Sequence, residues 1–370
     1  TATDIANDAV TADKIATGAV VADGLGAGAV TATKLGASAV TTAKIADTVN
    51  LGRRNVIING AMKVAQRGTS QTGITHNANE GYLIDRFDCA GAAHGGVFTM
   101  TQAADGPDGF ANCIKLDCTT ADTSTAAGEY LFLGTRLEGQ DLQQFKKGTS
   151  AAEEFTVSFY VKGNASAVYT LELVDSDNSR QISKTFAVTS SWNRIILTFP
   201  ADTTGAFDND NGTSLECAWW LGAGSTYSSG TLQTSWGSAV NANRAVGQVN
   251  LADSTSNEWY VTGLQLEAGT SASDFEFLPF DVNLLRCQRY FYVHTSTQSY
   301  YTGVNRGDGY NIYENSFPVQ MRAAPSLTEF SNGGIAGWSL GNATNQLLPA
   351  YKSPASSTRF PPSYKASSEL

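Results

Sequence analysis

Apolar residues recur at fixed places through the first fifty residues. Written in tens, this stretch reads TATDIANDAV, TADKIATGAV, VADGLGAGAV, TATKLGASAV and TTAKIADTVN. One such unit offers too little apolar surface to offset a backbone ordering entropy of about 1–2 kcal/mol per residue. The stripe is therefore expected to pack against identical copies around a rotation axis, as a shaft over residues 1–50. The predicted shaft contacts are Ile5, Ile15, Leu25, Leu35, Ile45, Val10, Val20, Val30 and Val40.

The alternative for this segment is a disordered Ala/Thr/Gly linker. A continuous coiled coil would need apolar residues every 3.5 positions, which this pattern does not supply. Thr11 or Thr31 can cap a short turn that Gly18 or Gly28 ends, with an extended Ala-Val step after it. A linker has no reason to keep its aliphatic residues in register, which favours the shaft. Because the chain opens within the pattern and without Met, further repeats are expected before residue 1.

After the repeats, the apolar pattern changes to the alternation that is typical of β-strands. Gly, Asn, Asp and Ser separate the apolar runs, and helical periodicity is nearly absent. One short helix could lie in Leu137–Phe145. Residues 51–282 are therefore predicted to form a two-sheet sandwich, most simply a jelly roll, in which Pro279 stops strand pairing. The clearest predicted strands are Phe155–Val161, Tyr169–Val174, Arg194–Phe199, Ser214–Leu221 and Trp259–Glu267.

Residues 283–370 are predicted to form a smaller, β-rich C-terminal domain. It starts with the aromatic-rich run LLRCQRYFYV, and FPVQMR continues it. The stretch Ser353–Leu370 is rich in Pro and Ser and is expected to be irregular. The predicted fold class is therefore all-β: a thin repeat shaft, a β-sandwich and a second β-rich unit in one symmetric oligomer.

Composition excludes several classes of partner. The net charge is −10, and no basic cluster is longer than Arg53-Arg54 or Lys146-Lys147, which argues against nucleic acid and anionic membranes. The sequence contains no apolar run long enough to span a membrane and no visible signal peptide, so a soluble protein outside the secretory route is expected.

The cysteines and acidic loops do not form a convincing metal site. Cys217 and Cys287 lie among apolar residues and are expected to be buried thiols of the core. The chain has five cysteines, of which Cys89 is another, and this odd number fits assembly in a reducing cytosol. Cys113 and Cys118 could pair or ligate, but no second Cys pair or His cluster joins them. The acidic run Asp208–Gly212 fails the register of an EF-hand and reads as a polar hairpin turn. No metal and no cofactor are predicted.

Catalysis is not expected either. The three histidines, His76, His94 and His294, lie in no nucleophile-elbow or Cys/His pattern and are expected in loops or on the surface. Glycan hydrolysis needs two carboxylates at a defined separation, whereas Glu153 and Glu154 are adjacent and point to opposite faces.

Several motifs together resemble bacteriophage tail-fibre proteins, especially those of marine and cyanobacterial phages. They are the decapeptide repeats, NVIINGAMKVAQRGTS with GYLIDRF behind it, WYVTGLQLEAGTSASDFEF, and LLRCQRYFY with FPVQMRAAPS. The sandwich strand alone is also similar to carbohydrate-binding modules. The resemblance implies a homotrimeric fibre in the virion, assembled in the host cytoplasm, that meets other tail proteins and contacts the host surface. The symmetric shaft follows from the repeats, and the number three comes mainly from the resemblance.

Sugar binding would use flat aromatic faces edged by polar groups. Alternation along Leu215–Leu221 places Trp220 opposite the core face, so Trp220 is predicted to be exposed as a platform, or else to pack beneath a loop or a neighbouring chain. Trp236 lies in a polar loop. Four tyrosines flank the turn Arg306–Gly309, which either reads a receptor or packs in the trimer. The candidate sugar-binding residues are Trp220, Trp236, Tyr300, Tyr301, Tyr310 and Tyr313.

The sequence thus predicts a non-enzymatic tail-fibre subunit that binds a host glycan such as lipopolysaccharide. Two alternatives remain. One is a tailspike-type glycan depolymerase, and the other is a virion adaptor that only packs against other tail proteins.

Overall fold

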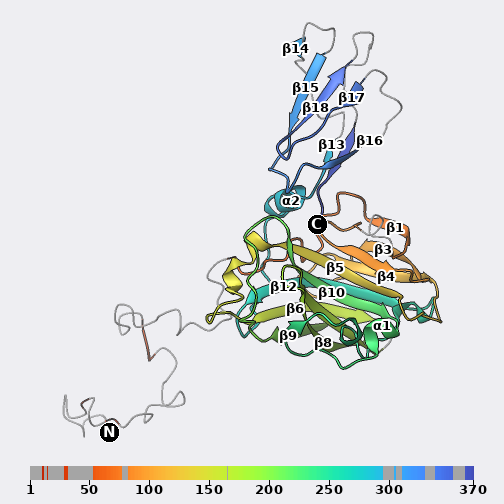
Figure 1. Cartoon of the computed structure of the whole chain (residues 1–370), viewed down its shortest axis with the longest axis vertical. Helices are drawn as coiled ribbons and strands as arrows, with labels where there is room; N and C mark the ends of the chain where they lie inside the picture. Colours follow the sequence, from red (N-terminus) through yellow and green to blue (C-terminus); the bar gives the residue numbers. More distant parts are fainter. Residues whose placement is uncertain are drawn as a thin grey trace. The chain divides into compact units, whose positions relative to one another are not determined.

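The computed structural model describes Thr11, Ile15 and residues 29–31, 53–76, 82–164, 166–294, 304–305, 311–329, 338–352 and 363–370 (Figure 1). Contacts divide the chain into Thr1–Val49 and Asn50–Leu370. Of the predicted shaft residues, Ile15 and Val30 are described, and their side chains are 45% and 54% exposed. The other shaft positions, Ile5, Val10, Val20, Leu25, Leu35, Val40 and Ile45, lie outside the described residues.

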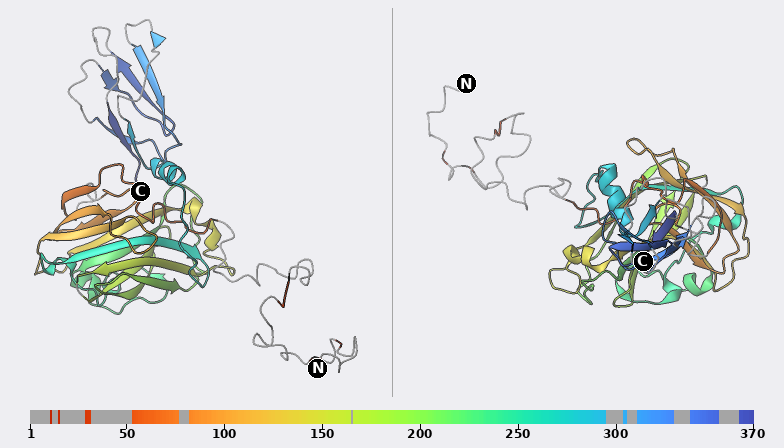
Figure 2. Two further views of the ribbon diagram at one scale, coloured as in Figure 1. Left: turned by 180° about the vertical axis from the view of Figure 1, so that it is seen from behind. Right: turned by 90° about the horizontal axis from the view of Figure 1, so that it is seen from above.

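Two six-stranded antiparallel sheets form a sandwich in the second unit (Figure 2). Sheet A has the order β1-β3-β4-β12-β6-β9, and sheet B has the order β11-β8-β7-β10-β5-β2. The strands of sheet A are β1 Ser70–Ile74, β3 Val97–Ala103, β4 Cys113–Thr120, β12 Glu258–Ala268, β6 Phe155–Gly163 and β9 Asn193–Phe199. Those of sheet B are β11 Gly237–Ser238, β8 Arg180–Val188, β7 Ala167–Asp175, β10 Thr213–Ala223, β5 Tyr130–Glu138 and β2 Asp88–Ala92.

The sandwich confirms the predicted all-β class and the five strands named from the sequence. Those strands correspond to β6, β7, β9, β10 and β12, each extended by one or two residues at one or both ends. The short helix expected in Leu137–Phe145 is not an α-helix. Strand β5 runs to Glu138, and two 3₁₀ turns follow it, η5 (Gly139–Asp141) and η6 (Gln143–Phe145).

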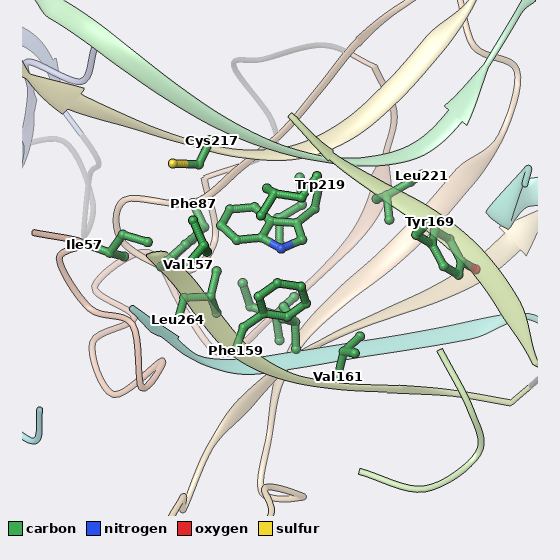
Figure 3. Close-up of a cluster of buried hydrophobic side chains, with 14 of the residues drawn as sticks. Ile57, Phe87, Val157, Phe159, Val161, Tyr169, Cys217, Trp219, Leu221 and Leu264 are labelled. Carbon is green, nitrogen blue, oxygen red and sulfur yellow. The ribbon is translucent and has the colours of Figure 1, made fainter. Parts of the chain in front are cut away.

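The core lies between the two sheets and follows the alternation of the sequence. Val157, Phe159 and Val161 of sheet A face Cys217 and Trp219 of sheet B (Figure 3). All five side chains are fully buried. The rings of Phe159 and Trp219 meet edge to face, with centroids 5.7 Å apart. These apolar and aromatic side chains on facing strands stabilise the sandwich, because their burial removes apolar surface from water.

The chain beyond the sandwich begins with a helix that the sequence did not reveal, α2 (Phe280–Gln288). Two small antiparallel sheets follow, β13-β19-β16 and β14-β15-β18-β17. Strand β19 lies within the C-terminal stretch that was expected to be irregular, and that expectation is wrong there. The strands are β13 Phe291–His294, β19 Tyr364–Ser367, β16 Ser326–Glu329, β14 Val304–Asn305, β15 Asn311–Ser316, β18 Leu347–Lys352 and β17 Trp338–Leu340.

A buried carboxylate joins the sandwich to the residues after α2. Glu138, at the end of β5, accepts hydrogen bonds from Arg289 Nε at 2.8 Å, Arg289 Nη2 at 2.7 Å and the Tyr290 hydroxyl at 2.5 Å. Burial acts to raise the pKa of Glu138, but these hydrogen bonds outweigh it and lower the pKa. The Arg86 guanidinium stacks 3.5 Å from the Tyr290 ring centroid and pairs with Glu369. The C-terminal residues are thus fixed against the sandwich.

No helix among the described residues is long and apolar enough to cross a membrane.

Candidate functional site

The first candidate platform, Trp220, is fully buried, so the prediction that it is exposed is wrong. Alternation placed it correctly on the outer face of sheet B, but that face is covered. The ring packs with Phe132, Tyr130 and Tyr227, whose centroids lie 5.9, 5.7 and 5.7 Å from it. The alternative prediction, that Trp220 packs beneath a loop, agrees with the structure.

The covering loop is the segment between β10 and β12, residues 224–250. It carries α1 (Ser225–Ser228) and η7 (Asn241–Asn243). Backbone bonds link its two arms: Ala245 N–H donates to Tyr227 O at 2.9 Å, and Gly230 N–H donates to Ala242 O at 2.8 Å. The Gln248 side chain accepts from Thr170 N–H on β7 at 2.8 Å. This loop turns the outer face of sheet B into a second, smaller core.

An ion pair between the buried Glu172 and the half-buried Arg244 stabilises this second core. Trp220 Nε1 donates to Glu172 Oε2 at 3.0 Å, and Arg244 Nε donates to Glu172 Oε1 at 2.9 Å. The Arg244 guanidinium also lies 5.1 Å from the Trp220 ring centroid. Both oxygens of Glu172 are therefore occupied, and the indole has no free edge for a sugar.

Trp236, the second candidate platform, is half-buried rather than exposed as a flat face. Its Nε1 donates to Pro200 O at 2.9 Å, and its ring centroid lies 5.5 Å from that of Phe155. Lys147 Nζ lies 5.5 Å from the Trp236 ring centroid. The ring thus closes one end of the main core. Tyr300, Tyr301 and Tyr310 lie outside the described residues, as does the side chain of Tyr313.

A pocket of about 720 Å³ lies between the sandwich and the small sheet β13-β19-β16. Arg67, Gln71, Tyr82 and Arg136 contribute the sandwich side. The opposite side is built from β16, β19 and their flanking residues, namely Arg322, Ala324, Ser326, Thr328, Lys365, Ser367, Ser368, Glu369 and Leu370, and Phe291 of β13 also lines the pocket. This concavity brings aromatic rings, guanidinium groups and hydroxyl groups together, which is the set that ligand sites of proteins use for orientation.

Arg136 holds the sandwich wall of the pocket in place. Its Nη1 donates to Tyr82 OH and to Asp88 Oδ2, both at 3.0 Å, and its Nη2 lies 2.7 Å from Glu216 Oε1. The Tyr82 hydroxyl donates in turn to Leu370 O at 3.2 Å. Burial raises the pKa of Asp88 to about 6, although Arg136 acts in the opposite direction.

Two further arginines shape the other walls. The Arg67 guanidinium stacks 3.5 Å from the Phe291 ring centroid, and its Nη2 lies 3.1 Å from Glu369 Oε1. Arg322 donates to backbone carbonyls: Nε to Ser368 O at 2.7 Å and Nη2 to Glu369 O at 3.0 Å. Because these planar groups are held by several bonds each, the pocket walls are preorganised.

The sequence analysis did not single out these pocket residues. Tyr82 and Arg322 lie within the motifs GYLIDRF and FPVQMR, but nothing in the motifs indicates that the two residues share a pocket. Arg136 lies on β5 between Thr135 and Leu137, and nothing in that strand indicates a pocket. Only the pairing of β5 and the position of β19 bring them together.

In the described part of the chain, the remaining candidates for metal binding are not grouped into a site. The expectation of a loop or surface position is wrong for His294, which is 2% exposed and lies on β13. His94 lies in a loop as expected, but it is also only 2% exposed. Cys113 and Cys118 are free and buried, as are the other three cysteines. No described group of three or more His, Cys, Asp or Glu residues is placed to hold a metal ion.

No protein-family model matches the sequence, and a search of curated proteins finds no match. Among solved structures, the chain is similar to a family 11 carbohydrate-binding module from Clostridium thermocellum in complex with a β-1,3-1,4-mixed-linked tetrasaccharide, with 11% identity, a TM-score of 0.29, and coverage of 55% of this chain and 98% of that one. The chain is also similar to the N-terminal cellulose-binding domain of Cellulomonas fimi β-1,4-glucanase C. The identity is 9% and the TM-score is 0.26, with coverage of 55% of this chain and 97% of that one. A third similar structure is the enzymatically active domain of tailspike protein 4 of bacteriophage CBA120. The identity is 8% and the TM-score is 0.28, with coverage of 58% of this chain and 21% of that one.

Proposed function

We propose that this chain is a structural, non-enzymatic subunit of a bacteriophage tail fibre that attaches the virion to a glycan of the host surface. The repeats support self-association, because their aliphatic positions need identical neighbours for burial. The proposed assembly is a homotrimer that forms in the host cytoplasm and joins other tail proteins in the virion. Residues 53–370 then supply the glycan contact.

The observation that carries the proposal is the pocket between the sandwich and the sheet β13-β19-β16. Its volume of about 720 Å³ lies within the range of roughly 300–1,000 Å³ typical of ligand sites. The wall offers Tyr82 and the hydroxyl-bearing side chains Ser326 and Thr328. A sugar presents apolar ring faces and many hydroxyl groups, so it matches a wall that mixes aromatic and hydrogen-bonding groups.

A weak single pocket is sufficient for attachment. Linked copies of a binding site convert later contacts into intramolecular ones and raise avidity by roughly 10²–10⁴. A symmetric fibre presents one pocket per chain, and several fibres multiply the number again. Modest affinity for one glycan unit is therefore compatible with stable attachment of a virion.

The pocket favours binding over hydrolysis. A glycosidase places two carboxyl groups on either side of the scissile bond. Among the described residues that line the pocket, Glu369 is the single acidic side chain, and it is paired with Arg67 and Arg86. The second alternative, a virion adaptor, would leave the pocket without a glycan.

The test is to fill the pocket without removing a packed group. Thr328 is exposed on β16, so Thr328→Trp should block the cavity while the melting temperature stays unchanged. Binding to host cells and to a glycan array should fall at least about tenfold, as expected for the loss of a few contacts. Thr119→Trp, at an exposed position of β4 outside the pocket, is the matched control and should bind like the wild type.

Each alternative gives a different result. Release of reducing ends from host polysaccharide by the wild-type protein would favour the depolymerase. A wild-type protein that binds no host cell, while the fibre remains on virions, would favour the adaptor. Equal binding by Thr328→Trp and Thr119→Trp would exclude this pocket as the glycan site.

A further inference from the structure

The lining of the pocket between the sandwich and the sheet β13-β19-β16 is basic, whereas the chain as a whole is acidic. The chain has 34 acidic and 24 basic residues, for a net charge of −10. Among the described residues that line the pocket, Glu369 is the single acidic side chain, and the basic ones are Arg67, Arg136, Arg322 and Lys365. Basic side chains are therefore concentrated at this site.

Two of the four basic side chains already have carboxylate partners. Arg67 Nη2 lies 3.1 Å from Glu369 Oε1. Arg136 forms ion pairs with Asp88 at 3.0 Å and with Glu216 at 2.7 Å. A charge that is paired in this way attracts a further anion only weakly, because the partner's opposite charge cancels most of its field. The other two basic residues therefore decide which charge the pocket offers to a ligand.

The Arg322 guanidinium is held without a counter-ion. Its Nε donates to Ser368 O at 2.7 Å and its Nη2 to Glu369 O at 3.0 Å. Its Nη1 donates to Asn211 O at 3.3 Å. All three acceptors are backbone carbonyls, and Arg322 forms no ion pair within the described part of the chain. Carbonyl groups orient a guanidinium and leave it its full charge, and two of its five N–H donors remain for a ligand.

Lys365 adds a second positive charge on a face that also carries hydroxyl groups. Lys365 of β19 lies opposite Thr328 of β16 in the antiparallel ladder, and Ser367 lies opposite Ser326. All four residues line the pocket. Directly opposite residues of an antiparallel pair have Cβ atoms about 4.5–5.5 Å apart, and alternate residues share a face. The Lys365 side chain therefore shares one face of this sheet with three hydroxyl groups.

We infer that the pocket selects a sugar that bears an anionic group, a carboxylate or a phosphate ester, over a neutral sugar. Guanidinium and ammonium groups bind both anions through charge-assisted hydrogen bonds. The hydroxyl groups of the same face can bond to the hydroxyl groups of the sugar. A neutral sugar would exclude water from Arg322 without a compensating charge, which is unfavourable. The inference rests on the proposed function and narrows its ligand from glycans in general to acidic glycans.

The first test compares acidic glycans with matched neutral forms on an array. The array carries uronic-acid oligosaccharides beside their methyl esters, and phosphorylated oligosaccharides beside the same sugars without phosphate. The wild-type full chain should bind an acidic form at least about tenfold more tightly than its neutral partner, as expected for a hydrogen bond between charged groups. The class of acidic glycan that is bound identifies the anion as a carboxylate or a phosphate.

The second test changes the charge of the pocket without removing a packed group. Thr328 is exposed and lies opposite Lys365, so Thr328→Glu places a carboxylate beside the ammonium group. Thr328→Gln is the uncharged variant of nearly the same size. Thr328→Glu should bind the acidic glycan at least about tenfold more weakly than Thr328→Gln, because its carboxylate repels the ligand. Thr119→Glu adds the same charge at an exposed position of β4 outside the pocket and should bind like the wild type.

Two outcomes would overturn the inference: neutral forms that bind as tightly as their acidic partners, or equal binding of the acidic glycan by Thr328→Glu and Thr328→Gln. The glycan proposal fails separately. Neutral glycans that bind the wild type and not Thr328→Trp would leave the glycan proposal intact. A wild-type protein that binds no glycan of either kind would remove the glycan proposal, and the inference with it.

Discussion

The ammonium group of Lys147 lies 2.5 Å from the carboxylate of Asp175, and both side chains are fully buried. Asp202 Oδ2 lies 3.0 Å from the same nitrogen. The carbonyl oxygens of Thr204 and Gly205 accept from it at 2.9 and 2.7 Å. Lys147 is thus a covalently tethered cation inside a cage of four oxygen atoms.

Removal of this cation should destabilise the sandwich strongly. Lys147→Met leaves two buried carboxylates without their shared partner, and breaking such a pair costs about 3–5 kcal/mol. Urea denaturation should show this loss in the free energy of unfolding. The neighbouring Lys146 pairs with Glu153 at the surface, where the two side chains are 52% and 40% exposed. Lys146→Met should therefore change stability by less than about 1 kcal/mol, and equal effects of both variants would contradict the cage.

The same cage should accept a calcium ion once the ammonium is gone. Carboxylate and carbonyl oxygens are the ligands that Ca²⁺ prefers, and water can complete its coordination. In Lys147→Ala, CaCl₂ should raise the melting temperature, because a ligand at a hundredfold excess over its Kd adds about 2.7 kcal/mol of stability. The wild-type protein should not respond. A variant whose melting temperature ignores calcium would show that the oxygens are too few or too far apart.

Trp220 should act as a core residue rather than a binding residue. Trp220→Ala removes a fully buried ring and leaves Glu172 with one partner fewer, so a loss of about 3–5 kcal/mol is expected. Differential scanning calorimetry would measure it. Trp220→Phe keeps the ring volume in part and should recover some stability. An unchanged melting temperature for Trp220→Ala would contradict the second core.

The stability of the protein should depend on pH through Asp88. Burial raises the pKa of this carboxyl to about 6, above its ordinary value of 3.8. The folded state therefore binds this proton more tightly than the unfolded state between pH 4 and 6. The contribution is fully present below the unfolded pKa and is lost as the pH rises through the folded pKa. The stability difference between the wild type and Asp88→Asn, measured by urea denaturation at each pH, should shift against the wild type from pH 4 to 6. A constant difference would contradict the raised pKa.

The sequence determined five of the twelve sandwich strands and the side chains that two of them turn toward the core. Period-two alternation along Phe155–Val161 and Leu215–Leu221 identified the side chains that enter the core, because successive residues of a strand point to opposite faces. The helix α2 gave no such signal, because only Asn283 and Cys287 of its nine residues are buried and two of its apolar residues, Phe280 and Leu285, are exposed.

Only the tertiary structure decided what covers each face. Trp220 was correctly placed outside the main core, yet the loop of residues 224–250 covers it with Arg244 and Ala245, which lie more than 20 residues further along the chain. The glycan pocket joins Tyr82 of one segment to Thr328 and Arg322 of another. Alternation is a local property that fixes the direction of a side chain, whereas the partner that meets it depends on contacts between distant segments.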